Sequence, residues 1–267
     1  MLEVLNTQFP RGQIRHALFD FDGTLSLIRE GWQDVMIPMM VELLLDTPLA
    51  EGAARIEAIV KGFVTRLTGK QTIYQMIQLA DEIRARGGEA QEPLEYKYLY
   101  LARLNARIAG RIDALKAGRT NPDELMVPGS RGILDALRDR GVRCYLASGT
   151  DEPFVLDEAA ALDLTPYFAG IYGAKDDYKA FSKRMVIDRI ISDHGLAGPE
   201  LVAFGDGYVE IEDTKRAGGI AVGLATDEAR RAGVDEWKRN RLIEAGADIV
   251  IPDFSDQARL VAYLWGE

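Results

Sequence analysis

Several acidic residues, a serine, a glycine and a lysine in this sequence have the types and spacing expected of a site for a divalent cation and a phosphate. Each stands directly after a short apolar stretch or at the start of a segment with helical period. The residues are Asp20, Asp22, Ser148, Gly149, Lys183, Asp206 and Glu210. Carboxylate oxygens are the ligands that hard divalent cations prefer, and hydroxyl and ammonium groups bind phosphoryl oxygens. The set therefore predicts metal-assisted chemistry on a phosphorylated group.

The apolar stretches that precede these residues predict buried strands, because they are rich in Val, Ile and Phe and end at Gly, Asp, Ser or Pro. They cover residues 14–19, 142–147, 201–204, 220–224 and 248–251. Segments of helical period lie between them, with glycine stops at Gly141 and Gly195. Alternating strands and helices predict an α/β fold, a doubly wound, Rossmann-like parallel sheet covered on both faces.

This architecture would bring the polar residues together at one edge. Parallel α/β sheets bind ligands at the carboxyl ends of their strands. The run Asp20-Phe21-Asp22-Gly23-Thr24 follows the first predicted strand, Ser148-Gly149-Thr150 follows the second, and Gly205-Asp206-Gly207 follows the third. We therefore expect their side chains to line the same edge of the sheet.

Residues 30–121 have a different pattern, with no convincing strand. Helical periods cover residues 32–45, 51–67, 72–86 and 93–115, and glycines separate some of them. About ninety residues are too many for a structureless connection between strands. The sequence therefore predicts an inserted all-helical domain over 30–121 and a catalytic core made of 1–29 and 122–267.

Composition excludes several other classes of protein. The formal net charge of −10 opposes binding to nucleic acid or anionic lipid. Cys144 is the single cysteine, so no internal disulfide or cysteine-built zinc site is expected. No apolar segment approaches the ~20 residues of a membrane span, and residues 1–10 lack the basic start and apolar centre of a secretory signal. A cytoplasmic protein with no membrane partner is expected, and its oligomeric state is not predicted.

Four motifs in this order resemble those of the haloacid dehalogenase-like hydrolases, most of which are magnesium-dependent phosphatases. The first is Asp20-x-Asp22-Gly-Thr-Leu, the second is Ser148-Gly149, the third is Lys183 at a helix start, and the fourth is Gly205-Asp206-Gly-Tyr-Val-Glu210. The resemblance extends along the whole chain. The helical insert between the first two motifs is similar to the family's cap of the first type.

The resemblance implies a role for each motif residue. Asp20 would attack phosphorus and form an aspartyl-phosphate, and Asp22 would act as general acid and base. Mg²⁺ would bind the Asp20 carboxylate, the Asp22 backbone carbonyl and the Asp206 carboxylate. The remaining motif residues would hold the phosphate: Ser148, the Gly149 amide and Lys183, which would also contact Asp20.

Three assignments have open alternatives. Glu210 stands where the family usually has Asp, so it would either reach the metal, directly or through water, or serve the electrostatics of the helix start. Lys179 competes with Lys183 for the third motif. Lys70, in a polar glycine turn of the insert, would either face the substrate or belong to a loop capped by threonine.

The function expected from these residues is that of a magnesium-dependent phosphomonoesterase acting on a small phosphorylated metabolite, with a sugar or polyol phosphate favoured. A carboxylate at Asp22 argues against a dehalogenase or phosphonatase, since their leaving groups need no proton from this position. A sugar-phosphate phosphomutase would share Asp20 and Asp22, and the sequence does not separate it from a phosphatase. A noncatalytic binding module is disfavoured because Asp20, Asp22 and Asp206 are all present.

Overall fold

The computed structural model describes residues 2–267, which divide into two compact units. One unit comprises the chain up to Glu30 together with Ile112–Glu267, and the other comprises Gly31–Arg111. The first boundary lies beside the one expected from the sequence. The second lies after Arg111, inside the helix α4 (Pro93–Lys116), and not at residue 121, which follows the end of that helix.

The first unit is built on a seven-stranded sheet with the order β1-β7-β6-β5-β2-β3-β4. The strands are β1 (Glu3–Val4), β2 (His16–Phe19), β3 (Arg143–Asp151), β4 (Phe168–Ala174), β5 (Leu201–Gly205), β6 (Ile220–Leu224) and β7 (Ile249–Ile251). All neighbouring pairs are parallel except β1 with β7. In-register pairing of β2 with both β3 and β5 makes β2 an interior strand and places the ends of these three strands together.

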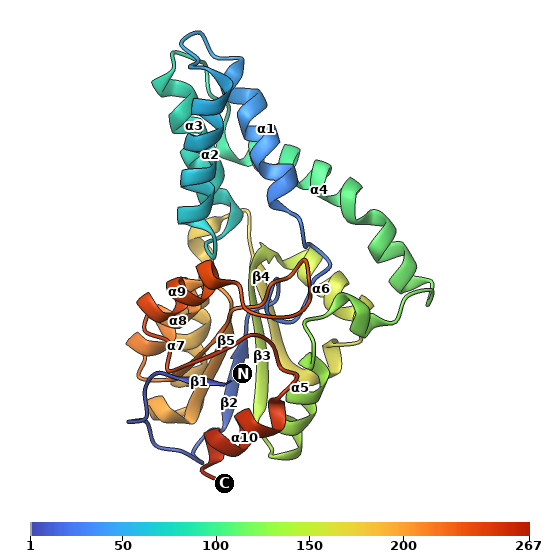
Figure 1. Cartoon of the computed structure of the whole chain (residues 1–267), viewed down its shortest axis with the longest axis vertical. Coiled ribbons are helices and arrows are strands. Elements are labelled where there is room, and N and C mark those ends of the chain that lie inside the picture. The colour runs from blue at the N-terminus through green and yellow to red at the C-terminus, as the bar shows by residue number, and fades with distance from the viewer. Residues whose placement is uncertain (1) are drawn as a thin grey trace. The chain divides into compact units, whose positions relative to one another are not determined.

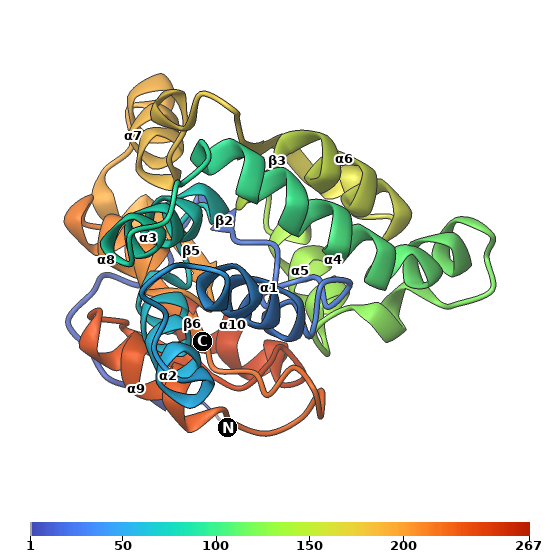
Figure 2. The ribbon, with the colours of Figure 1, turned by 90° about the horizontal axis from the view of Figure 1, so that it is seen from above.

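Helices cover both faces of this sheet (Figures 1 and 2). They are α5 (Ser130–Asp139), α6 (Glu152–Ala161), α7 (Lys183–His194), α8 (Tyr208–Arg216), α9 (Glu236–Glu244) and α10 (Gln257–Trp265). Figure 2 shows α7, α8 and α9 on one side of the strands and α5, α6 and α10 on the other. This arrangement follows from right-handed crossovers in both directions from β2. It confirms the doubly wound α/β fold expected from the sequence.

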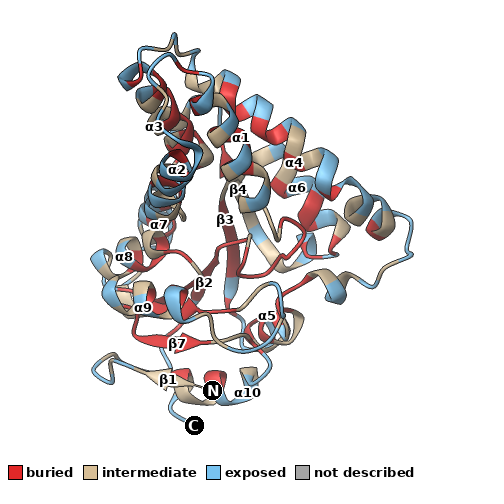
Figure 3. Cartoon of the chain, turned by 45° about the horizontal axis from the view of Figure 1, so that its top comes forward, coloured by how far each residue is buried: buried red, intermediate tan, exposed pale blue. Residues whose placement is uncertain are grey.

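The central strands are buried on both faces, as their continuous apolar composition predicts (Figure 3). Leu18 belongs to the cluster that packs against α7. The next residue, Phe19, points to the opposite face and stacks on Phe204 with ring centroids 4.5 Å apart. Packing on both faces therefore holds the strand end at residue 19 firmly in place.

The second unit is helical, in agreement with the sequence. Its helices are α1 (Gln33–Leu45), α2 (Ala53–Leu67), α3 (Thr72–Ala85) and most of α4. Each buries one stripe of apolar side chains; in α1 these are Met36, Met39, Met40 and Leu44. The methionines thus form part of the core of this unit.

Two strands of the first unit were not expected from the sequence, β1 and β4. No helix in residues 2–267 has both the length and the apolar character that crossing a bilayer requires.

Candidate active site

Asp20 is the first residue after β2 and is 7% exposed. Its backbone N donates to the Phe204 carbonyl at 2.9 Å, which extends the pairing of β2 with β5 by one residue. Its Oδ1 accepts hydrogen bonds from the Phe21 amide at 2.8 Å and lies 2.9 Å from Lys183 Nζ. Backbone pairing and these two contacts fix the carboxylate in one orientation.

The turn after Asp20 needs glycine at position 23. Gly23 has φ +75°, and a Cβ built there would lie 2.4 Å from Asp206 Oδ2. Its amide donates to the Ser26 carbonyl at 2.9 Å and closes the turn. Since only glycine tolerates both the conformation and the close approach, Gly23 allows the loop to pack directly on Asp206.

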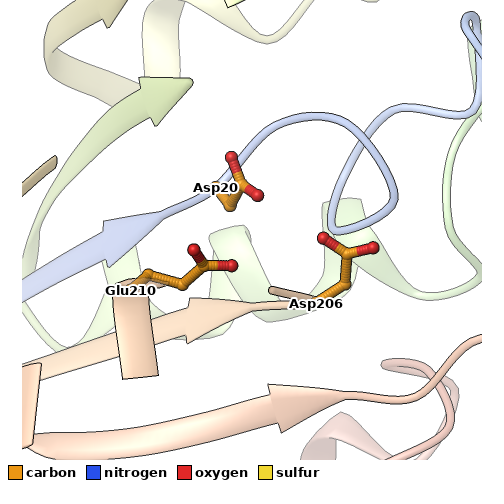
Figure 4. Close-up of side chains that lie close together, drawn as sticks. All are labelled: Asp20, Asp206 and Glu210. Atoms are coloured by element: carbon orange, nitrogen blue, oxygen red, sulfur yellow. The ribbon is translucent and has the colours of Figure 1, made fainter. Parts of the chain in front are cut away.

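Asp20, Asp206 and Glu210 bring their carboxylates together (Figure 4). One oxygen of each lies within 4.8 Å of the others. Asp206 follows β5, and Glu210 stands in the first turn of α8. Clustered hard oxygen ligands, mostly buried, suit a divalent cation such as Mg²⁺, so the residues present fit the metal that the sequence implied.

Glu210 uses both of its oxygens within the protein. Oε1 accepts a hydrogen bond from the Gly207 amide at 2.7 Å and so caps α8, and Oε2 accepts one from Lys183 Nζ at 2.9 Å. The hydrogen bond from the Gly207 amide matches the alternative in which Glu210 serves the start of α8. A metal bound directly to Glu210 would have to share one of these oxygens, so direct coordination stays a prediction.

Lys183 connects Asp20 to Glu210. Its Nζ lies 2.9 Å from an oxygen of each, and Ser182 caps the start of α7 by accepting from the Met185 amide. Burial raises the pKa of Asp20, Lys183 opposes that effect, and the nearby Glu210 and Asp206 reinforce it. Burial alone would lower the pKa of Lys183, but the Asp20 and Glu210 carboxylates outweigh it and hold the pKa above its ordinary value. A charged Lys183 thus supplies part of the positive charge that this acidic site requires.

Lys179, the competing residue, is exposed, and its Nζ lies 5.9 Å from the centroid of the Tyr178 ring. Lys70 belongs to the other unit, is also exposed, and lies 5.7 Å from the ring of Tyr74. The structure therefore brings Lys183 to the carboxylates in the first unit, and the substrate contact of Lys70 stays a prediction.

Two hydroxyl groups from β3 donate to Asp22. Thr150 Oγ1 lies 2.8 Å from Asp22 Oδ2, and Ser148 Oγ lies 3.3 Å from the same oxygen. Gly149 stands between them, half-buried, in the same strand. A hydrogen bond from Thr150 to Asp22 was not predicted. Residues two apart in a strand share a face, so the spacing of Thr150 from Ser148 could have indicated it.

A buried ion pair that was not predicted from the sequence lies next to Asp22. Arg29 Nη2 donates to Glu158 Oε1 at 2.6 Å, and Glu158 is 1% exposed. Arg29 Nε also lies 3.9 Å from Asp22 Oδ1. Burial raises the pKa of Glu158 to about 7 against the opposing charge of Arg29. Because Arg29 and Glu158 are 129 positions apart in the sequence, no local pattern could have indicated the pair.

The model of the haloacid dehalogenase-like hydrolase family matches residues 14–218 of this chain. The chain belongs to that family. The match includes all four motifs and confirms both the resemblance seen in the sequence and the expectation of an enzyme. Among curated relatives of this haloacid dehalogenase-like hydrolase is a 5'-nucleotidase of Pseudomonas aeruginosa, 24% identical over 221 residues that cover 81% of this chain and 87% of the relative.

Solved structures show the same fold at low sequence identity. One is described as a predicted phosphoglycolate phosphatase from Haemophilus somnus, with a TM-score of 0.60, 16% identity, and coverage of 93% of this chain and 98% of that one. Another is a phosphonoacetaldehyde hydrolase-like protein from Oleispira antarctica, with a TM-score of 0.62, 15% identity and 99% coverage of both chains. At these identities the likeness establishes the family fold and leaves the reaction to the site residues.

Proposed function

We propose that this protein is a magnesium-dependent phosphomonoesterase of the cytoplasm that acts through an aspartyl-phosphate on Asp20. The observation that carries the proposal is the constellation at the carboxyl edge of the sheet. The buried Asp20, which pairs with Lys183, lies beside the carboxylates of Asp206 and Glu210. Asp22 accepts hydrogen bonds from two hydroxyl groups. The name of the Pseudomonas relative is consistent with the same reaction type.

In the proposed reaction, Asp20 binds Lys183 through Oδ1 and attacks phosphorus with Oδ2. Lys183 would hold phosphoryl oxygens as negative charge develops on them, and so would Ser148 once its hydroxyl turns from Asp22 Oδ2 to the substrate. A bound Mg²⁺ would neutralise the carboxylates of Asp20 and Asp206 and so allow an anionic phosphate to approach.

Asp22 is proposed to move the proton. Among residues 2–267, Asp22 Oδ1 is buried and has no hydrogen-bond partner, whereas Oδ2 accepts from Thr150 and Ser148. The Asp22 carboxyl is the group we expect to give a proton to the leaving alcohol and later to take one from water. The Thr150 hydroxyl, which donates to Oδ2 at 2.8 Å, holds the carboxyl in one orientation for that task.

The proposed substrate is a small phosphorylated metabolite, with a sugar or polyol phosphate favoured and nucleoside monophosphates added by the likeness to a 5'-nucleotidase. A phosphomutase of a sugar phosphate would use the same Asp20 and Asp22. It differs in returning the phosphoryl group to another hydroxyl of the substrate, so release of inorganic phosphate separates the two reactions.

A screen of phosphorylated metabolites tests the reaction and its metal together. We expect inorganic phosphate to be released from at least one member of the panel with Mg²⁺ present, and excess chelator to abolish the release until Mg²⁺ is restored. Ca²⁺ should substitute poorly, because its larger and looser coordination shell would misplace the Asp20 oxygen. Full activity in excess chelator would contradict the metal dependence, and isomerised substrate without phosphate would identify a mutase.

The third motif can be tested with two lysine variants. We expect Lys183→Ala to lower kcat roughly 10²- to 10³-fold, since it removes a donor to the developing charge. Lys179→Ala should leave kcat unchanged because its side chain is exposed and lies against Tyr178. Steady-state kinetics, with thermal denaturation as a check on folding, measure both. The reverse pattern would assign the third motif to Lys179.

A further inference from the structure

A second lysine lies against the carboxylate cluster, on α9, and none of the four motifs includes it. Lys238 Nζ lies 2.6 Å from Asp206 Oδ2 and forms a second ion pair with Glu228. The lysine is 9% exposed, and the side chain of Glu228 is also largely buried. Lys238 thus bridges Asp206 to a glutamate outside the motifs, much as Lys183 bridges Asp20 to Glu210.

The backbone around this pair is well anchored. Asp235 caps α9 by accepting from the Lys238 amide at 3.0 Å, and the Asp235 amide donates to the Ala225 carbonyl at 2.8 Å. Ala225 in turn donates to the Ile251 carbonyl at 2.8 Å, so the loop that carries Glu228 begins at the sheet. The fold therefore sets the position of Lys238 in the first turn of α9, from which its ammonium group contacts Asp206.

The pair also borders the first motif. A Cβ at Gly23 would lie 2.4 Å from Asp206 Oδ2 and 3.0 Å from Glu228 Oε1. Asp206 Oδ2 is therefore enclosed between the Gly23 turn and the Lys238 ammonium group. Figure 4 shows one oxygen of Asp206 turned toward Asp20 and the other turned away from it. A carboxylate enclosed in this way has little freedom to rotate.

We propose that Lys238, oriented by Glu228, is a positioning residue that pins the Asp206 carboxylate for binding of the divalent cation. This inference rests on the proposed metal site. Residues that hold a ligating carboxylate from outside fix its orientation, and their loss typically weakens metal binding about 10- to 100-fold. The pair carries no net charge, so its removal as a unit alters the orientation of Asp206 with little change in the charge of the site.

Removal of Lys238 alone would change both the orientation of Asp206 and the charge of the site. Glu228 would remain as an extra anion beside the metal site and would attract cations. The test therefore uses Lys238→Met with Glu228→Gln. The matched control is Lys215→Met with Asp248→Asn, since Lys215 Nζ lies 2.8 Å from both oxygens of a fully buried Asp248. Both double variants delete a lysine–carboxylate pair without changing net charge, and the control pair is not among the carboxylates near Asp20.

Mg²⁺ affinity is measured by isothermal titration calorimetry without substrate, with thermal denaturation to establish folding. We expect the Kd to rise about 10- to 100-fold in the Lys238/Glu228 variant and to stay unchanged in the Lys215/Asp248 control. If the first variant does not fold, Lys238→Arg, which keeps the charge and displaces the donor, replaces it, with a several-fold rise in Kd expected.

The remaining outcomes overturn the inference. An unchanged or lower Kd in the Lys238/Glu228 variant, with normal binding by the wild type, would mean that the pair does not position Asp206 or that Lys238 competes with the cation. An equal rise in the control would show a general effect of lost stability. Failure of the wild type to bind Mg²⁺ would instead refute the metal site of the proposed function, and the positioning role with it.

Discussion

Asp20→Asn is expected to fold normally and to lose phosphatase turnover by on the order of 10⁴-fold or more, the scale seen when a covalent nucleophile is removed from other enzymes. The amide is nearly isosteric with the carboxylate, and its oxygen can still accept from the Phe21 amide and from Lys183. It cannot attack phosphorus as an anion and is a poor ligand for a hard cation. The variant therefore removes the chemistry and retains the shape of the site.

The measurement is kcat/KM with an activated aryl phosphate. Its aryl alcohol leaves without protonation by an acid, so the rate reports on the nucleophile. Asp188→Asn serves as the matched control, because Asp188 is exposed on α7 and pairs with Arg184 in the same helix. Thermal denaturation should give similar midpoints for the control and for Asp20→Asn. Turnover of Asp20→Asn near the wild-type rate would refute an aspartyl-phosphate on this residue.

Asp22→Ala is expected to lose turnover by an amount that depends on the leaving group. General acid or base catalysis is typically worth about 10²- to 10⁴-fold, so an alkyl phosphate should lose roughly that factor in the first step. An aryl phosphate, whose leaving group departs with little protonation, should lose much less in that step. Loss of the base should also slow hydrolysis of the aspartyl-phosphate, since no other residue is proposed to activate the water.

Rapid mixing resolves the two steps of this variant. With an aryl phosphate we expect a burst of aryl alcohol close to one equivalent, followed by slow steady turnover. Thr150→Val is a useful companion, because it removes the 2.8 Å hydrogen bond to Asp22 Oδ2 while it leaves the carboxyl in place. Equal losses for alkyl and aryl substrates, with no burst, would indicate that Asp22 acts only through its backbone and the geometry of the loop.

Many elements of this protein could be read from local sequence because their signals are local. Continuous apolar runs indicated β2, β5, β6 and β7 and most of β3, and helical periods indicated α1 to α4 nearly to the residue. The positions of Asp20, Ser148 and Asp206 after successive strands, together with Lys183 at a helix start, were sufficient to indicate the family. These features depend on the order of residue types along short segments, and that order can be read directly from the sequence.

Two strands were missed because their stability comes from distant partners. β4 contains Gly170 and Gly173, lies at the edge of the sheet and is only partly buried, so its apolar signal is weak. β1 has two residues and exists through antiparallel pairing with β7, near the other end of the chain. No window of local sequence contains that pairing.

Only the tertiary structure decided which side chains complete the site. The parallel register that sets Phe19 opposite Phe204 places Asp20 beside Asp206, and the packing of α7 and α9 then brings a lysine to each carboxylate. Lys183 meets Glu210 across 27 residues and Lys238 meets Asp206 across 32, without any motif that links the members of either pair. Sequence determined the reactive residue types and the strands that carry them, because both are local. The ion pairs that orient them depend on helix packing and strand register, which exist only once the whole core has folded.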